Sequence, residues 1–452
     1  MNPNFLLSDA YAGHLYREYA RVLPIVDFHN HLSAAELASD KSFDNITKLW
    51  ISADPYKHRA MRILGIPESY ITGAANDFEK FEQWYHCLPR LVGNVLFDWS
   101  VMEFAQILEM PLLPFRTDVK ALWEELNEKL SSLSAQRILA RFPIVYNAPC
   151  ASLADTLDAF DPAAGLCPSL RGDDITAPVP DFIQTLSALT GQTILSLDTY
   201  EYAIAVRLQD FLNAGCCFSD HALDDGFRYL PEDGQNDRRF LCLLQGKSLE
   251  KADQNALTSR LLRTMSGLYA RYQLTMQLHI GARRSTSTRL RRIAGSAGGY
   301  AAMGNSVDLS SLVAMLDDIE QQPYGLPKTL LFTLNPADNA MLSTLSGSFS
   351  KDGMEALVSQ GPAWWWCDHY QGIRDMLDHM AAFGVLSTFV GMTTDSRSLL
   401  SFVRHDYFRR VLCSWISERR TKGLLPDDET ILSSLIRGIC YENAAKLTKR
   451  QA

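Results

Sequence analysis

The chain has 452 residues, of which 47% are hydrophobic and 21% charged, and its formal net charge is −9. This size suits one large domain with an insertion, or about two to three domains. An acidic chain without a dense basic run is a poor candidate for binding nucleic acid or an anionic membrane surface. The sequence has no signal-peptide pattern and no apolar run of transmembrane length, and its nine cysteines form no CxxC pair. These features predict reduced thiols in a cytoplasmic protein.

The first third of the chain contains one strand pattern and many helix patterns. A capped helix is expected over residues 8–20, followed by a strand at about 22–29. Residues 33–140 have almost no strand signal, and we predict a helical insertion there that stands over the end of the first strand. Its expected helices are 44–50, 56–64, 77–86, 98–108 and 117–140.

The remaining chain alternates short apolar runs with helical stretches. With the strand at 22–29, the runs make eight: 142–146, 165–170, 215–219, 275–280, 329–334, 358–365 and 386–392. Helices are expected between them at 181–190, 200–213, 253–272, 307–320, 338–346, 370–383 and 404–419, with a closing helix at 430–447. Alternating strands and helices predict a parallel sheet buried on both faces. Eight repeats favour an α/β fold in which residues 1–452 form a single distorted (β/α)₈ TIM-like barrel.

Two histidines close the first strand. His29 and His31 are separated by one residue, so their side chains share one face of a strand. An isolated pair of this kind is more often two satisfied polar residues in a turn than a zinc site. Here other polar residues also follow the expected strands, where a barrel gathers them around one pocket. They are Arg171, Asp220, His221, His279, Asn335, residues 364–368, Asp395 and Arg397.

The sequence resembles the uronate (glucuronate) isomerase family of the amidohydrolase superfamily along essentially its whole length. The stretches that carry the resemblance are DFHNHLS (27–33), DPYKHRAM (54–61), ITGAANDFEKFEQW (71–84), SDHALD (219–224), QLHIGARR (277–284), LPKTLLFTLNPADNAMLSTLSGSF (326–349), GPAWWWCD (361–368) and FVGMTTDSRSLLSFVRHDYFRRVLC (389–413). The family interconverts the aldose and ketose forms of hexuronic acids, such as glucuronate with fructuronate and galacturonate with tagaturonate.

The resemblance implies a site for one divalent metal ion, with zinc expected first and manganese as the alternative. By position, the ligands would be His29, His31 and Asp395. Asp395 would also carry the proton between C2 and C1, and Arg397 would stabilise an oxyanion. Tyr56 would donate to a substrate hydroxyl, unless it is an ordinary aromatic residue at a helix start. The residues expected to bind a small sugar acid or to orient the ligands are Arg171, His221, His279, Trp365, Arg409 and Arg410.

Several loop positions depart from the family pattern. Pro55 replaces a histidine in D-H-Y-K-W-R-A-M, and Asp98 and Val101 replace both histidines of G-N-P-L-Y-H-W-T-H-L-E. Residues 146–150 replace T-T-D-D-P, and serine and threonine occupy the asparagine positions at 285–287. We therefore expect an acidic-sugar isomerase with weak or no activity on plain glucuronate, unless these loop histidines are peripheral.

Two other classes of function remain open, together with the state of assembly. A metal-dependent hydrolase of a small carboxylated substrate would use a metal-bound hydroxide, although no lysine stands at a strand end to form a bridging carbamate. A non-catalytic sugar-acid-binding homologue would bind without metal-dependent turnover. The protein is expected to be a homo-oligomer.

Overall fold

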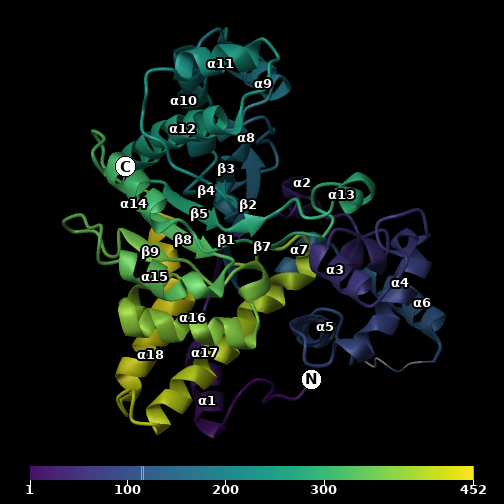
Figure 1. The fold of residues 1–452 in the computed structure, drawn as a ribbon. Coiled ribbons are helices and arrows are strands. Elements are labelled where there is room, and N and C mark those ends of the chain that lie inside the picture. Colours follow the sequence, from purple (N-terminus) through teal and green to yellow (C-terminus); the bar gives the residue numbers. More distant parts are fainter. Residues whose placement is uncertain (113–114, 116, 451–452) are drawn as a thin grey trace.

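A parallel sheet of seven strands forms the centre of the structure (Figure 1), a computed structural model that describes residues 1–112, 115 and 117–450. The strands neighbour one another in the order β1-β2-β3-β4-β5-β8-β9, and each neighbouring pair is parallel. Their bounds are β1 (Ile25–Asn30), β2 (Ile144–Ser152), β3 (Ser169–Arg171), β4 (Phe218–Leu223), β5 (Thr275–Ile280), β8 (Thr329–Thr333) and β9 (Val358–Gln360). Helices connect the strands, as the alternation in the sequence predicts.

The eighth predicted strand, 386–392, is not a strand among the described residues. It begins with a 3₁₀ turn, η8 (Leu386–Thr388), and the chain then runs beside β1 without regular pairing. Asp395 N donates to the His29 carbonyl at 3.1 Å, and His31 N donates to the Ser396 carbonyl at 2.8 Å. The barrel is therefore distorted, as predicted, because its last segment returns to β1 through irregular contacts.

The side chain of Asp27 in β1 holds this returning segment in place by hydrogen bonds. Its carboxylate is fully buried and accepts from Thr393 Oγ1 at 2.8 Å, Thr394 N at 2.7 Å and Thr394 Oγ1 at 2.7 Å. Asn30 Nδ2 donates to the same carboxylate at 2.8 Å. These side-chain bonds replace the missing ladder, since each buried acceptor finds a donor.

The segment between β1 and β2 is helical, as expected. Its α-helices are α2 (Ala34–Ala38), α3 (Pro55–Ile63), α4 (Asp77–Cys87), α5 (Val95–Gln106), α6 (Val119–Leu130) and α7 (Ala135–Leu139), with the π-helical turn η2 (Lys48–Ser52). Asp54 caps α3 by accepting from the Tyr56 and Lys57 amides. The ring of Trp99 in this segment meets the ring of Tyr407 in α17 (Val403–Thr421) edge to face, with the ring centroids 6.4 Å apart. The description of 33–140 as an insertion within a single domain stays a prediction.

The other helices surround the sheet. Their bounds are α1 (Ala10–Leu15), α8 (Asp173–Thr176), α9 (Pro180–Thr190), α10 (Leu197–Asn213), α11 (Asn236–Leu244), α12 (Lys251–Tyr272), α13 (Thr288–Ala294), α14 (Leu309–Glu320), α15 (Asn339–Leu345), α16 (Tyr370–Phe383), α17 (Val403–Thr421), α18 (Glu429–Arg437) and α19 (Asn443–Leu447). Short 3₁₀ or π turns are η1 (Tyr16–Ala20), η3 (Glu68–Tyr70), η4 (Leu88–Leu91), η5 (Pro162–Ala164), η6 (Pro336–Asp338), η7 (Trp365–Cys367), η9 (Leu399–Phe402) and η10 (Gly438–Glu442). Within the described part of the chain, no helix has both the length and the apolar character to cross a bilayer.

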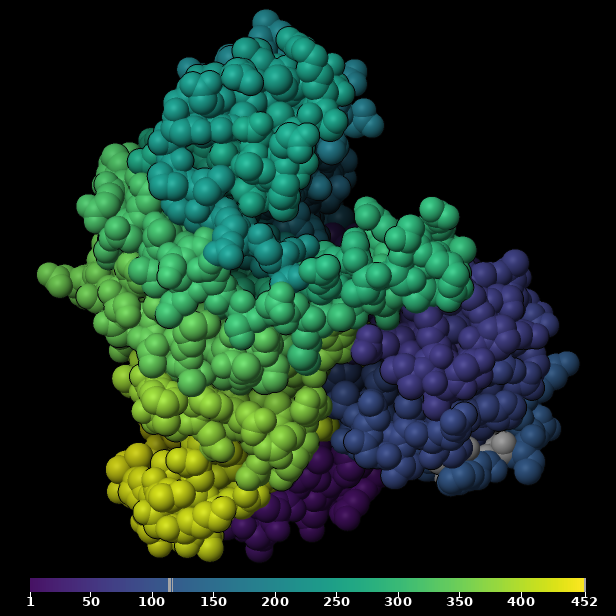
Figure 2. Space-filling model, viewed as in Figure 1, coloured from purple at the N-terminus to yellow at the C-terminus, as the bar shows by residue number. Residues whose placement is uncertain are grey.

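An arm leaves the barrel after β5. Its base is an antiparallel pair, β6 (Ala282–Arg283) with β7 (Ala302–Met303), and α13 lies between them. We call residues 282–303 the β6–β7 arm. It reaches across to α3 of the helical segment (Figure 2), where Arg62 Nη1 donates to the Gly298 carbonyl and Arg59 Nη1 donates to the Ala301 carbonyl at 3.2 Å.

Glycine is required at the contact between this arm and α3. Gly299 has φ +76°, and a Cβ there would lie 2.2 Å from the Pro55 carbonyl oxygen. The close approach of the two backbones holds the arm over the end of β1.

Candidate active site

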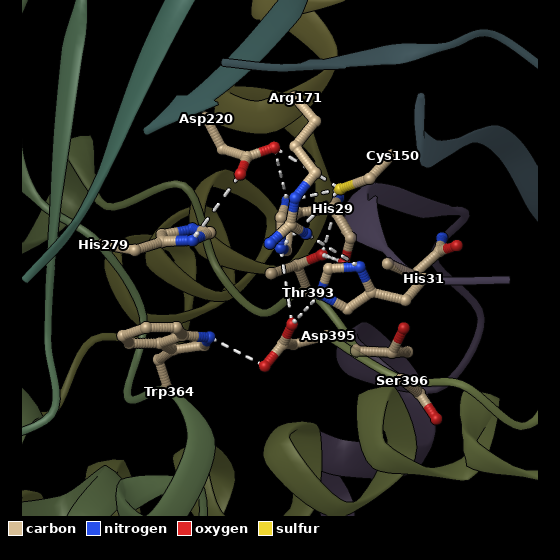
Figure 3. Close-up of polar contacts among 12 residues, drawn as sticks. His29, His31, Cys150, Arg171, Asp220, His279, Trp364, Thr393, Asp395 and Ser396 are labelled. Carbon is tan, nitrogen blue, oxygen red and sulfur yellow. Dashed lines mark hydrogen bonds and ion pairs between the residues drawn. The ribbon is translucent and has the colours of Figure 1, made fainter. Parts of the chain in front are cut away.

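The three predicted metal ligands lie together at the end of β1 (Figure 3). Asp395 Oδ1 is 3.3 Å from His29 Nε2 and 3.2 Å from His31 Nε2. The two histidines project from one side because alternate residues of a strand share a face. Asp395 completes the group because its amide is bonded to the His29 carbonyl.

Asp395 is held in an unusual backbone conformation. Its φ is +46°, in the left-handed region that non-glycine residues seldom occupy. Its second carboxylate oxygen accepts from Trp364 Nε1 at 2.7 Å, which fixes the plane of the carboxylate. Burial would raise the pKa of Asp395, but hydrogen bonds from His29 and His31 hold that pKa well below its ordinary value. The carboxylate is therefore ionised at neutral pH.

The other edge of His29 faces a thiol and a second carboxylate. Cys150 Sγ is 3.3 Å from His29 Nδ1, and Asp220 Oδ1 is 3.8 Å from the same nitrogen. Burial raises the pKa of Cys150 to about 11, so this group is a neutral thiol that donates to Asp220 Oδ1 at 3.4 Å. A carboxylate behind a histidine orients its ring and makes it a better metal ligand.

The donor set fits a divalent metal ion. Two ligand atoms that each lie about 2.1 Å from one ion are roughly 3.0–3.4 Å apart at octahedral or tetrahedral angles. The distances from Asp395 Oδ1 to the two imidazole nitrogens fall in that range. Ligand atoms of His29, His31 and Cys150 also lie within 4.8 Å of one another. Imidazole and carboxylate together suit zinc, and manganese is compatible with them.

A cavity of about 390 Å³ opens beside this group. Its walls come from the ends of β1, β3, β5 and β9, from α3 and from the β6–β7 arm. The lining includes five arginines, which are Arg171, Arg284, Arg291, Arg397 and Arg404. A pocket of this size with convergent polar groups is typical of a small-molecule site, and the arginines favour an anionic ligand.

Six of the predicted substrate and catalytic residues line this cavity, namely Tyr56, Arg171, His279, Trp365, Asp395 and Arg397. The His279 ring stacks on Trp364 with the ring centroids 4.5 Å apart, and its Nε2 has no hydrogen-bond partner among the described residues. Burial lowers the pKa of His279 well below its ordinary value, so the ring is neutral. The Tyr56 hydroxyl is likewise buried without a partner in the described structure. Both groups are available to bind a substrate hydroxyl.

Arg171 lies between the proposed metal ligand His31 and the carboxylate of Asp173. It donates to Asp173 Oδ2 at 2.9 Å, and its Nη1 is 3.5 Å from His31 Nδ1. It therefore contacts the back of a predicted metal ligand as well as the cavity.

Arg409 and Arg410, expected to bind substrate, do not reach the cavity. Arg409 donates to the carbonyls of Leu23 and Pro24, before β1. Arg410 donates to Asp406 and to carbonyls near the N-terminus. Both side chains stabilise the opposite end of β1, so we do not retain them as substrate ligands.

His221 also faces away from the cavity. Asp220 points into the barrel and its neighbour His221 points outward to α12, because successive residues of β4 alternate. His221 Nε2 is 2.8 Å from the Tyr269 hydroxyl, and the ring packs against Gly172, where a Cβ would lie 2.0 Å from its Cε1. Its place is structural.

The burial of His221 predicts a loss of stability in acid. Burial lowers its pKa from 6.5 to about 4, so the stabilisation is complete above pH 6.5 and is lost as pH falls toward 4. We expect a loss of about 3 kcal/mol over that window. In urea unfolding with chelator from pH 7.5 to 4.5, His221→Gln should flatten this slope and His86→Gln, at an exposed position, should not. An unchanged slope in His221→Gln would contradict the assignment.

Only one of the three replaced family histidines lies at the cavity. Pro55 lines it, whereas Asp98 and Val101 of α5 do not. Asp98 accepts weakly from the Tyr407 hydroxyl at 3.5 Å, and burial raises its pKa to about 6. The expectation of an altered substrate therefore depends on Pro55 and Ser285, which line the cavity, and on the change at 146–150, where Cys150 adjoins His29.

The structure shows contacts of residues for which the sequence predicted no role. Trp364, rather than Trp365, bonds Asp395, and Cys150 adjoins His29. Arg404 lies 3.8 Å from the Trp99 ring centroid, under the cavity, and donates to Asp368 Oδ2 at 3.4 Å. Burial raises the pKa of Asp368 to about 7. Strand alternation could have paired Asp220 with His29, but contacts made from loops leave no such periodic pattern.

Comparison with known proteins gives the family. A family model described as glucuronate isomerase matches residues 1–448. The chain belongs to this family. A uronate isomerase from Salmonella typhimurium is 35% identical over 462 aligned residues, covering 99% of this chain and 98% of the relative. The curated uronate isomerase from Salmonella paratyphi B matches equally well. Membership makes the chain an intramolecular oxidoreductase, an aldose–ketose isomerase of hexuronic acids.

Solved structures agree with the fold. A uronate isomerase from Thermotoga maritima superposes with a TM-score of 0.92 at 25% identity, covering 99% of both chains. The glucuronate isomerase from Caulobacter crescentus has a TM-score of 0.89 at 20% identity, covering 99% of this chain and 96% of that one. The family shares this distorted barrel.

Proposed function

We propose that the chain moves the carbonyl of a hexuronic acid between C1 and C2 by proton transfer at the His29–His31–Asp395 group. The candidate pairs are glucuronate with fructuronate, galacturonate with tagaturonate, or those of a closely related sugar acid, and the loop departures make weak activity on plain glucuronate the expectation. The observation that carries the proposal is the convergence of two histidines and an ionised carboxylate on an arginine-lined cavity, in a chain of this family.

The chain's own groups account for the proton movement. Asp395 takes the C2 proton and returns it to C1, held in position by Trp364. Arg397 stabilises the negative charge that develops on oxygen, and the Tyr56 hydroxyl donates to the sugar. His279 and Trp365 position the sugar beside them, in its ring form or its open-chain form. His29, His31 and Asp395 would hold one divalent ion, zinc before manganese, and that ion would supply positive charge to stabilise the enediolate.

Turnover of a panel of uronates and aldonates, with and without chelator, tests this function. We expect a product of unchanged mass from at least one hexuronate and loss of turnover after chelation. A product heavier by one water would instead support the metal-dependent hydrolase, and binding without turnover would support a non-catalytic homologue. Efficient kcat/KM on plain glucuronate or galacturonate would defeat the altered-substrate expectation and leave the isomerase in place.

We also retain two proposals about the cellular setting. Cytoplasmic location is supported by the cysteine pattern. A homo-oligomeric state is an expectation that light scattering of the purified protein tests.

A further inference from the structure

The β6–β7 arm carries a local basic run. Five arginines occur within residues 283–292, although the whole chain is acidic, so the expectation of no dense basic run does not hold here. Arg283 pairs with Asp225 at 2.5 Å and Arg284 pairs with Asp224 at 2.8 Å. The arginines of α13 make no ion pair within the described residues; they are Arg289, Arg291 and Arg292.

Arg291 is the member of this α13 group that lines the cavity. Its one described hydrogen bond is a long one, from Nη1 to Ser285 Oγ at 3.4 Å. The arm that bears it is braced on α3 through the Gly298 and Ala301 carbonyls. In Figure 2 the arm, in green, lies against the helical segment, in purple and blue. The guanidinium is therefore delivered to the cavity by a supported element and not by a free loop.

The other cavity arginines differ in their charge partners. Arg171, Arg284 and Arg404 are each paired with an aspartate, in order Asp173, Asp224 and Asp368. In the described structure, Arg291 and Arg397 have no acidic partner. Arg397 follows Asp395 by two residues and so belongs to the reacting end of the cavity. Arg291 enters from the arm, on a different wall.

We propose that Arg291 binds the carboxylate of the sugar acid and sets the preference for acidic over neutral sugars. The inference rests on the proposed function, which requires one carboxylate remote from C1 and C2 to be held. A guanidinium offers two parallel N–H donors to a carboxylate, and one without an acidic partner has no competing anion to release. The resemblance implied that Arg171, with Arg409 or Arg410, would bind the carboxylate; Arg291 takes the part expected of Arg409 or Arg410.

Arg291→Gln is the decisive variant, with Arg292→Gln and Arg289→Gln as matched controls on the same helix. For whichever hexuronate the wild type converts, Arg291→Gln should raise KM about 10- to 100-fold, the usual effect of losing a charged hydrogen bond. Its kcat and metal content should change little. Arg291→Lys keeps the charge but loses the fork, and should give an intermediate KM. The control variants should stay within about threefold of the wild type.

Binding of unreactive ligands separates this inference from the isomerase proposal. L-Gulonate is glucuronate reduced at C1, and glucitol is its neutral counterpart. In calorimetry, Arg291→Gln should weaken gulonate binding more than tenfold and leave glucitol binding as in the wild type. A loss no greater than that in Arg292→Gln would overturn the role of Arg291. Failure of the wild type to convert any hexuronate would overturn the isomerase and leave the gulonate comparison valid.

Discussion

Replacing His29 with alanine is expected to remove the divalent metal and the isomerase activity together. His29 is fully buried, and its Nε2 lies 3.3 Å from Asp395 Oδ1, the other proposed ligand atom. Loss of this ligand removes charge stabilisation of several kcal/mol from the transition state, which corresponds to roughly 10²–10⁴-fold in kcat/KM. Metal content by mass spectrometry and uronate turnover measure the two effects on one preparation.

His86→Ala provides the control for that variant, since His86 is exposed on α4 and should retain both metal and activity. A deep cavity at position 29 can also disturb folding. The less buried His31→Ala, with circular dichroism on both variants, distinguishes loss of the metal from loss of the fold. A folded His29→Ala protein with full metal content and full turnover would sink the ligand assignment.

Asp395→Asn should abolish proton transfer while disturbing the fold little. The amide keeps the size of the side chain but cannot take a proton from C2 at neutral pH, and general-base catalysis contributes about 10²–10⁴-fold. We expect kcat to fall by that factor with a smaller change in KM. Exchange of the C2 hydrogen with deuterated solvent, followed by NMR, should be lost in parallel.

Asp317→Asn is the matched control. It is the same substitution, at an exposed position of α14 away from the cavity. Metal content must also be measured for Asp395→Asn. Loss of a metal ligand would lower the metal content, whereas loss of the proton acceptor alone would leave it unchanged. Solvent exchange at C2 that continues at the wild-type rate in a metal-loaded Asp395→Asn protein would assign the proton to another group.

Periodicity predicted most of this fold because helices and buried strands leave regular apolar patterns. Seven of the eight expected strands are present, and the helices between β1 and β2 lie near their predicted positions. The eighth strand was wrong because Phe389, Val390 and Met392 are apolar and buried, as in a strand, yet the chain that follows them is held by side-chain bonds between Asp27 and two threonines. Hydrophobicity alone cannot distinguish the two arrangements.

The site was predictable where its residues end strands. His29, His31 and His279 project from strand ends, and Asp395 follows the last apolar run, so all four converge. Arg409 and Arg410 were misplaced because chemical suitability for a carboxylate does not indicate which end of a strand a helix residue reaches. Arg291 was missed because it lies on an arm whose docking depends on a backbone contact at Gly299.

The hydrogen bonds that join Thr393 and Thr394 to Asp27 of β1 constrain when the barrel can close during synthesis. Asp27 and Thr394 are 367 positions apart, so the outer edge of β1 stays unpaired on the nascent chain until residue 394 has been made. Such distant pairing closes slowly, and an exposed strand edge invites wrong partners meanwhile. Asp395 emerges with the same stretch, so the proposed ligand set is complete only when the barrel can also close. A polypeptide released before residue 393 therefore lacks both.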